Sequence, residues 1–327
     1  MISIIIANFN KEAFVEQTIR SALAQDQVSE LIVVDDASSD GSMDVIRRTV
    51  GNDPRAIVIG LETNRGQSFT ENRGLERATG KYVIYLDSDD LLAPACCANR
   101  LRTAEDAPGF DAWVFPMTTF EDDPARPNGA WIPRAGDHLR HVLAHKLDWQ
   151  LMQALWRREF LVRIGGFDET FVRLTDVSLH TRALLAGARV KCCPGLPPDC
   201  MYRIAPERYS WSVDELAARH VKGAIHYVTT YRPQVPARLR YLLAGTLLAA
   251  IHRLVHWRRI GKLSPARFDE LSRQLVSEAL SPRQRAILKG YLWANLASPV
   301  HVRGLSWIAR KALRLPIPSV RRSPFPG

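Results

Sequence analysis

Three carboxylates, Asp87, Asp89 and Asp90, directly follow the apolar residues 82–86 in the segment YVIYLDSDDLLAP. Like charges so close together repel, and ionised carboxylates at the edge of a buried strand are costly to desolvate. A divalent cation among them would remove this difficulty. Residues two apart on a strand point to the same side, so Asp87 and Asp89 could share one hard cation with phosphate oxygens and water. The alternative is a solvated acidic turn, which an Asp-x-Asp pair on its own favours.

A second acidic pair, Asp35 and Asp36, follows another apolar run in VVDDASSDGS. An aspartate there could accept a hydrogen bond from N3–H of a pyrimidine base while a backbone amide donates to a base carbonyl. The alternative is a polar turn closed by Asx and Ser caps. Further along, NRGQSFTENRG supplies glycines for a close backbone approach and Arg65 or Arg73 for positive charge.

The elements that must position these side chains alternate between strand and helix. Apolar runs without period-2 alternation predict buried strands within residues 1–10, 29–42, 56–64 and 81–90. Helices are predicted between them, within residues 11–25, 43–51 and 66–80. This alternation is typical of an α/β fold whose mostly parallel sheet has helices on both faces. Ligands bind beyond the carboxyl ends of such strands, where the polar residues of this chain collect.

The remainder of the chain is less regular. We expect a helix over 95–104, a strand within 110–120, a loop over 121–136, a helical middle and a strand within 188–195. From about Val213 the pattern is mostly helical. The chain therefore divides into residues 1–94 and 95–212, as two halves of one domain, and a helical region, 213–327.

The charge is unevenly divided along the chain. Residues 1–214 carry 24 Lys and Arg against 30 Asp and Glu, a net of −6, and residues 215–327 carry 20 against 4, a net of +16; the two sum to +10. Basic residues alternate there with apolar runs and with Trp257, Trp293 and Trp307, a pattern that suits the headgroup region of an anionic membrane. The alternative is a set of packed helices with a solvated basic face. No nucleic-acid-binding motif accompanies the charge, so we expect no nucleic-acid partner.

Five cysteines bear on the compartment. They are odd in number and lack C-x-x-C spacing, which argues against a disulfide framework or a zinc site and fits a reducing cytoplasm. The first residues lack a basic region and a cleavage site, and the longest uncharged apolar run, 241–251, is too short to span a bilayer. We expect a cytoplasmic protein that can lie on the inner face of the cytoplasmic membrane.

The order and spacing of these motifs resemble the inverting family 2 glycosyltransferases, which have the GT-A fold. The resemblance covers residues 2–92 almost without gaps, through ISIIIANFN, ELIVVDDASSDGS, NRGQSFTENRG and YVIYLDSDD. A second patch, WRREFLVRIGGFDETFVRLTDVSLHTRALLAG, is similar to the acceptor half of the family, and YRIAPERYSWS to the Tyr-Arg segment that often follows.

The resemblance implies a role for each matching position. Asp176 would be the catalytic base, with a helix N-cap as the alternative, and Asp89 with Asp87 would bind Mg²⁺ or Mn²⁺. The nucleotide sugar would be bound by Ala7, Asn8, Asn10, Asp35, Asp36, Asn64, Arg65, Gly66, Asn72, Asp87 and Ser88. The acceptor would lie near Trp149, Gln150, Trp156, Thr175, Tyr202 and Arg203. A core position is the alternative for each of the two tryptophans.

The implied reaction moves a sugar from a UDP-, GDP- or dTDP-linked donor to a saccharide or lipid-linked acceptor, with inversion. Such a step belongs to the synthesis of cell-surface polysaccharide, lipopolysaccharide or another glycoconjugate. Three positions depart from the family pattern: Ala7 replaces a common Pro, Thr175 replaces the Glu of a Glu-Asp pair, and Ile204 and Ala205 stand where a His often follows Tyr-Arg.

Two other functions remain open. A Mg²⁺-dependent phosphohydrolase of the haloacid dehalogenase type also has Asp-x-Asp after a buried strand, but after the first strand, and it leaves VVDDASSDGS unexplained. A catalytically degenerate protein that only binds nucleotide sugar is the second, and Thr175 is the residue that favours it. A nucleotidyltransferase would be expected to have a Gly-rich loop after its first strand, where this chain has ANFNKEA.

Overall fold

The computed structural model describes residues 1–204, 212–276, 280–297 and 305–316. Its larger sheet has seven strands in the order β10-β6-β9-β4-β1-β2-β3. The four predicted strands are neighbours in this sheet and are mutually parallel: β1 (Ile2–Asn8), β2 (Val28–Asp35), β3 (Ala56–Gly60) and β4 (Tyr82–Tyr85). β1 pairs in parallel with β2 and β4, and β2 with β3, so their carboxyl ends meet at one edge of the sheet. The predicted α/β class is confirmed.

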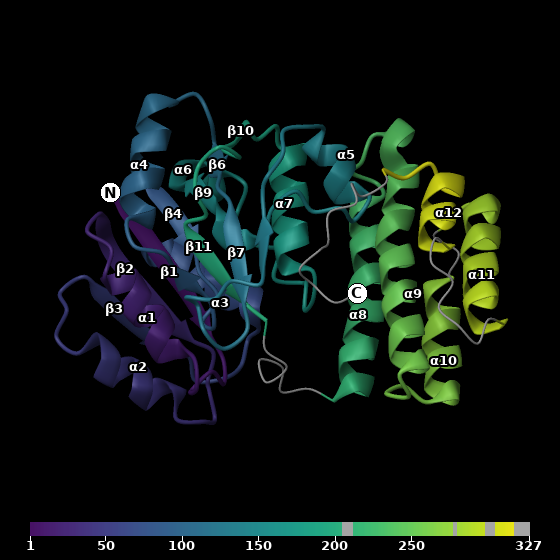
Figure 1. Ribbon diagram of the computed structural model, residues 1–327, viewed down its shortest axis with the longest axis horizontal. Helices are drawn as coiled ribbons and strands as arrows, with labels where there is room; N and C mark the ends of the chain where they lie inside the picture. Colours follow the sequence, from purple (N-terminus) through teal and green to yellow (C-terminus); the bar gives the residue numbers. More distant parts are fainter. Residues whose placement is uncertain (205–211, 277–279, 298–304, 317–327) are drawn as a thin grey trace.

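Helices cover both faces of this sheet, as Figure 1 shows: α1 (Val15–Leu23), α2 (Ser42–Val50) and α3 (Gln67–Arg77). Ile4 and Ile6 of β1 pack in the same core cluster as α1 and α2, whereas Ile5 packs with α3 on the opposite face. Burial of both faces explains why these strands lack a polar–apolar alternation. A Cβ at Gly74 would lie 2.3 Å from Ile5 Cγ2, so the glycine allows α3 to approach β1 closely.

The middle of the chain differs from the prediction. The expected strand within 110–120 is two strands, β6 (Ala112–Val114) and β7 (Met117–Phe120), which belong to different sheets. Pro116 separates them, and proline has no N–H to continue a ladder. Where a helical middle was expected, β9 (Ala154–Arg157) lies between β4 and β6, antiparallel to both.

A smaller sheet of four strands has the order β5-β11-β7-β8. It contains β5 (Leu91–Leu92), β8 (Gly129–Trp131) and β11 (Cys200–Arg203), and β8 lies in the expected loop. β10 (Val190–Cys192) instead belongs to the larger sheet, where it is the edge strand beside β6. The helices of this half are α4 (Cys96–Asp106), α5 (His138–Leu143), α6 (Arg158–Arg163) and α7 (Thr175–Leu185), with a 3-10 turn, η1 (Leu151–Gln153).

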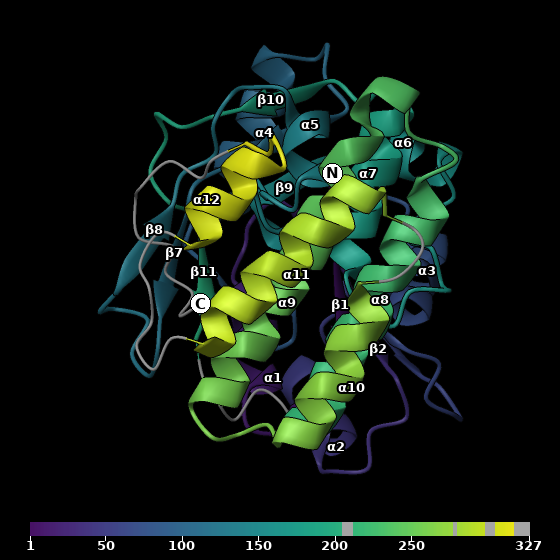
Figure 2. The ribbon, with the colours of Figure 1, turned by 90° about the vertical axis from the view of Figure 1, so that its right-hand side faces the viewer.

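The predicted helical C-terminal region is confirmed and packs beside α7 (Figures 1 and 2). It contains α8 (Val213–Tyr231), η3 (Ala237–Leu243), α9 (Ala244–Arg259), α10 (Pro265–Leu275), α11 (Pro282–Ala297) and α12 (Leu305–Ala312). The hydroxyl of Tyr231 on α8 lies 2.6 Å from that of Ser178 on α7, and these helices share one hydrophobic core with α5. Within the described ranges, none of the helices has both the length and the apolar character needed to span a membrane.

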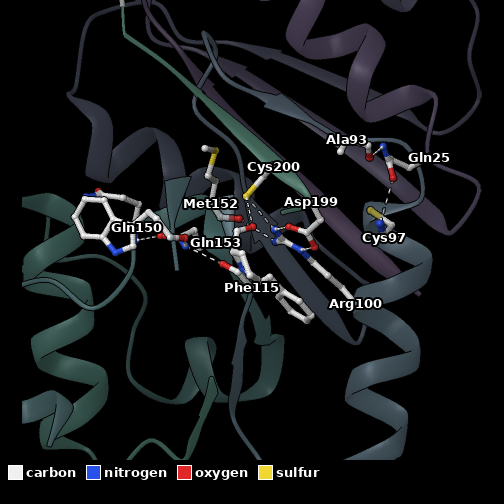
Figure 3. A network of polar contacts seen from close by, with 12 residues as sticks. Gln25, Ala93, Cys97, Arg100, Phe115, Gln150, Met152, Gln153, Asp199 and Cys200 are labelled. Atoms are coloured by element: carbon white, nitrogen blue, oxygen red, sulfur yellow. Dashed lines mark hydrogen bonds and ion pairs between the residues drawn. The ribbon is translucent and has the colours of Figure 1, made fainter. Parts of the chain in front are cut away.

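A buried ion pair joins α4 to the residue that precedes β11. Figure 3 shows the Arg100 guanidinium, from α4, against Asp199, Cys200 and Met152. Its Nε and Nη2 donate to the two carboxylate oxygens of Asp199 at 2.8 and 2.6 Å, and its Nη1 donates to the Met152 carbonyl at 2.9 Å. The amide of Ala93, just after the acidic turn, donates to the Asp199 carbonyl. Arg100 thus fixes Asp199, whose carbonyl is hydrogen-bonded to the backbone just after the acidic turn.

Candidate active site

The carboxyl ends of β1 and β2 are joined by side-chain hydrogen bonds. Asn8 and Asp35 are partners in the strand register, and Asn8 Nδ2 donates to Asp35 Oδ1 at 2.7 Å. Asp35 also accepts from the amide and the hydroxyl of Ser38, and Ser38 Oγ accepts from the Asn10 amide. Asn8 and Asp35 are buried, so they shape the turn, while Ala7 and Asn10 remain partly exposed at its surface.

Asp36 organises the start of α3. Its two carboxylate oxygens accept from the backbone amides of Arg65 and Gly66 at 2.7 and 2.8 Å, and its carbonyl accepts from Asn64 Nδ2 at 3.3 Å. Gly66 has φ +88°, a conformation that a residue with a Cβ rarely adopts. The Arg65 guanidinium is left exposed, stacked 4.3 Å from the centre of the Phe69 ring. The loop therefore presents a positive charge beside the strand ends.

The acidic turn after β4 is held from two sides. Arg203 of β11 donates its amide to Asp90 Oδ1 at 2.8 Å and its Nε to the Asp89 carbonyl at 3.0 Å. From the loop after β1, Lys11 Nζ forms an ion pair of 2.8 Å with Asp89 Oδ2. Asp89 and Asp90 are buried and Asp87 is half-buried, with Ser88 buried between them. The positive charge of Lys11 thus offsets part of the repulsion among these carboxylates.

The same turn offers a ligand set for a hard cation. One carboxylate oxygen from each of Asp87, Asp89 and Asp90 lies within 4.8 Å of the others. Oxygen donors of this kind suit Mg²⁺ and Mn²⁺ better than softer metals. Asp90 is engaged by the Arg203 amide, so Asp87 and Asp89 fit the ligand role best, and an ion on Asp89 Oδ2 would have to displace Lys11.

The segment before α7 is clamped onto α3. Asn72 on α3 donates its Nδ2 to the Phe167 carbonyl at 3.0 Å and accepts from the Phe167 amide at 2.8 Å. Arg182 donates to the carbonyls of Ile164 and Gly166, and a Cβ on Gly166 would lie 2.3 Å from Asn72 Oδ1. Asn72, which was predicted to bind the nucleotide sugar, therefore joins the two halves of the domain. The segment that it holds leads into α7, which carries Asp176 in its first turn.

Glu71, next to Asn72, lies near both predicted reaction groups, Asp87 and Asp176. It is buried, and only its Oε1 has a hydrogen-bond partner among the described residues, Gln67 Nε2 at 3.0 Å. Burial raises its pKa well above the ordinary value, and the nearby charges of Asp87 and Asp176 raise it further. Burial and these two neighbouring carboxylates thus favour the neutral form of Glu71.

Several residues predicted to line the acceptor site are buried. Trp149 and Trp156 are 2% and 1% exposed and pack against the His180 ring, so they are core residues, as the alternative had it. Arg203 is buried in its contacts with the acidic turn. Thr175 is buried at the start of α7, whereas Gln150 and Tyr202 are partly exposed. Asp176 is not the N-cap, because Leu174 occupies that position.

Three residues of this site were missed from the sequence. The sequence motifs predict no role for Lys11 or Glu71, and the family resemblance predicts that Arg203 lies near the acceptor instead of at the acidic turn. Lys11 lies in the loop just after β1. In a fold of this kind a charged residue beyond the carboxyl end of a strand indicates a ligand site. Glu71 lies on α3 four residues after Gln67, and helical spacing alone does not reveal that it is buried.

Known proteins match this chain in sequence and in fold. Residues 3–164 match the family model described as glycosyl transferase family 2. TuaG of Bacillus subtilis, named as a teichuronic acid biosynthesis glycosyltransferase, is 41% identical over 91 residues, which cover 28% of this chain and 36% of TuaG. The matched segment thus spans well under half of that relative.

Among solved structures, residues 1–349 of S. aureus TarS align with 96% of this chain and 91% of that chain, with a TM-score of 0.63 and 17% identity. The mannosyltransferase PcManGT from Pyrobaculum calidifontis, solved with GDP-Man and Mn²⁺, aligns with 96% of this chain and 85% of its own, with a TM-score of 0.55 and 19% identity. At these identities the likeness shows the fold. Together with the sequence match, it identifies this chain as a member of glycosyltransferase family 2 with the GT-A fold.

Proposed function

We propose that this protein transfers a sugar from a nucleotide-diphosphate donor to a hydroxyl acceptor, with inversion and with help from Mg²⁺ or Mn²⁺. The observation that carries the proposal is the acidic turn at the carboxyl end of β4, where one carboxylate oxygen from each of Asp87, Asp89 and Asp90 lies within 4.8 Å of the others. Asp176 comes from a distant segment, the first turn of α7, and is the group proposed to act near the acceptor.

The donor class is supported by the structural relatives. TarS has been solved with UDP-GlcNAc and PcManGT with GDP-Man and Mn²⁺. In this chain the donor would lie across the carboxyl ends of β1, β2 and β4, with Ala7, Asn10, Asn64 and Arg65 at the surface near the base and Asp87 near the ribose. TuaG, named for teichuronic acid biosynthesis, supports a product at the cell surface.

The proposed chemistry is a single displacement. The acceptor oxygen forms a bond to the anomeric carbon while the bond from that carbon to the phosphate oxygen breaks, and the nucleoside diphosphate leaves with the electron pair. Asp176 takes the acceptor proton as general base. A cation bound by Asp87 and Asp89 supplies charge neutralisation for the diphosphate. One displacement from the face opposite the leaving group inverts the anomeric carbon.

The experiment is a panel of UDP-, GDP- and dTDP-sugars incubated with the protein and Mn²⁺, with release of nucleoside diphosphate as the readout. Asp176→Asn should lower turnover by about 10²–10⁴-fold, the usual contribution of a general base, and leave donor affinity unchanged. Asp89→Asn should weaken Mn²⁺-dependent donor binding, measured by calorimetry. The control is Asp44→Asn, which alters an exposed carboxylate on α2.

Each rival function predicts its own outcome in this panel or in a parallel assay with phosphomonoesters. Release of inorganic phosphate from phosphomonoesters would support the phosphohydrolase. Donor binding without turnover for any sugar or acceptor would support the degenerate binder. Donor binding that is equal in Asp89→Asn and Asp44→Asn would exclude the metal role of Asp89.

We further propose that the protein binds an anionic membrane surface. Trp293 on α11 is 73% exposed, and Trp307 and Ile308 on α12 are 46% and 56% exposed. They lie in the region of net charge +16, whose sign complements anionic headgroups. Full-length protein should float with anionic but not zwitterionic vesicles, and Trp293→Ser with Trp307→Ser should reduce flotation. Equal flotation with both lipids, or none with either, would contradict this part.

A further inference from the structure

A second group of metal-binding residue types lies in and just after α5 and shares no residue with the acidic turn. His138 and His141 are three residues apart and so lie on the same face of this helix. The chain then turns back and brings Asp148 against both rings. Asp148 Oδ2 lies 2.7 Å from His138 Nδ1 and 2.8 Å from His141 Nδ1. We propose that these three side chains bind one zinc ion or a similar transition-metal ion.

The donor atoms are already close enough to share an ion. The two ring nitrogens and a carboxylate oxygen lie within 4.8 Å of one another. In a tetrahedral zinc site with bonds of about 2.0–2.1 Å, neighbouring ligand atoms are about 3.3 Å apart. The two N···O distances therefore need to lengthen by about half an ångström, which small rotations of the rings and the carboxylate provide. The hydrogen bonds between these groups keep the ligands assembled.

The surroundings orient the rings. The side chains of His138, His141 and Asp148 are 12%, 22% and 6% exposed. His138 Nε2 lies 3.7 Å from Cys192 Sγ, so a proton on Nε2 can be donated to sulfur while the Nδ1 lone pair faces the ion. Metal-bound histidines usually donate their other N–H in this way.

The type of ligand separates this site from the acidic turn. Two imidazoles and one carboxylate favour zinc, cobalt or nickel, whereas the all-oxygen turn favours Mg²⁺ and Mn²⁺. With three protein ligands, the partial exposure of His141 admits water as the fourth. The five cysteines lack the spacing of a zinc site, and this ligand set does not use them.

A bound ion would act on the helix that carries Asp176. Trp149, next to Asp148, packs 5.0 Å from the His138 ring and 5.1 Å from the His180 ring, measured between ring centres. His180 lies about one turn along α7 from Asp176. The ion would therefore fix the loop after α5 against α7, and its expected effect is on stability.

The experiment uses full-length protein, freed of metal with a chelator and kept in excess Mg²⁺ so that the acidic turn is supplied with a hard cation. Titration with Zn²⁺ by calorimetry should show one saturable site and a rise in Tm. His138→Gln and Asp148→Asn should each weaken zinc affinity at least about tenfold. His256→Gln, which removes an exposed histidine of α9, is the matched control and should bind zinc as the unchanged protein does.

The proposal is overturned if the unchanged protein shows no saturable zinc site. It is also overturned if His138→Gln and Asp148→Asn bind zinc as tightly as His256→Gln. Should both ligand variants fail to fold, Co²⁺ added to the unchanged protein decides. Absorption bands of four- or five-coordinate cobalt with nitrogen ligands support the site, and the spectrum of six-coordinate aqueous cobalt rejects it.

Discussion

Lys11 makes a direct test of the metal role of Asp89 possible. Its Nζ lies 2.8 Å from Asp89 Oδ2, and the two side chains are only 17% and 3% exposed. An ion that binds Asp89 through Oδ2 must first displace this ammonium group. Lys11→Met keeps an unbranched apolar side chain and removes the charge, so the competition is lost while the loop packing is largely preserved.

The size of the effect follows from this contact. Hydrogen bonds that involve charged groups contribute about 1.5–3 kcal/mol net. At about 1.4 kcal/mol per factor of ten, removal of that contact should tighten the dissociation constant of Mn²⁺ by roughly 10- to 150-fold. The change should be seen without nucleotide, because a bound diphosphate would itself interact with Lys11.

The assay is a titration with Mn²⁺ in which the electron paramagnetic resonance signal of free Mn²⁺ reports binding. Lys81→Met is the matched control, because it removes the same charge from an exposed position. If Lys11→Met bound Mn²⁺ no more tightly than Lys81→Met, then Asp89 would not be a ligand that Lys11 blocks. Unchanged circular dichroism would confirm that both variants are folded.

Three further predictions concern stability. Arg100→Met leaves Asp199 buried without its partner and should lower the free energy of unfolding by about 3–5 kcal/mol in urea titrations, and adding Asp199→Leu should recover most of it. Gly165→Ala and Gly166→Ala both place a side chain at positive φ, but only the second Cβ would meet Asn72 within 3 Å, so its Tm should fall further. Burial holds the pKa of His180 at about 4, so between about pH 6.5 and 4 the unfolded chain binds a proton that the folded chain does not. The free energy of unfolding therefore falls as pH is lowered through this window, and His180→Phe should flatten the fall; an unchanged slope would contradict the burial of this histidine.

The parallel part of the fold could be predicted from the sequence because its signals are local. Each of β1 to β4 is an apolar run followed by polar residues, and burial on both faces removes the alternation. β9 could not be predicted, since four residues, ALWR, carry too little pattern to distinguish a strand from a helix turn. β11 is equally short, and its place beside β5 and β7 depends on pairing between distant segments.

The candidate site divides in the same way. The residue types and their order predicted the acidic turn as a site, and the family resemblance predicted Asp176. The sequence could not show that Lys11 meets Asp89, that Arg203 holds the turn, or that Asn72 joins α3 to the Phe167 backbone. Each of these contacts joins residues that are far apart in the sequence.

The sequence by itself determined the parallel sheet, the family and the chemical types that gather at the strand ends, since each depends on neighbouring residues. The tertiary structure decided which side chains are buried, as with Trp149, Trp156 and Glu71. The physical reason is that burial and charge pairing depend on what packs against a residue from other segments, and no local spacing encodes that.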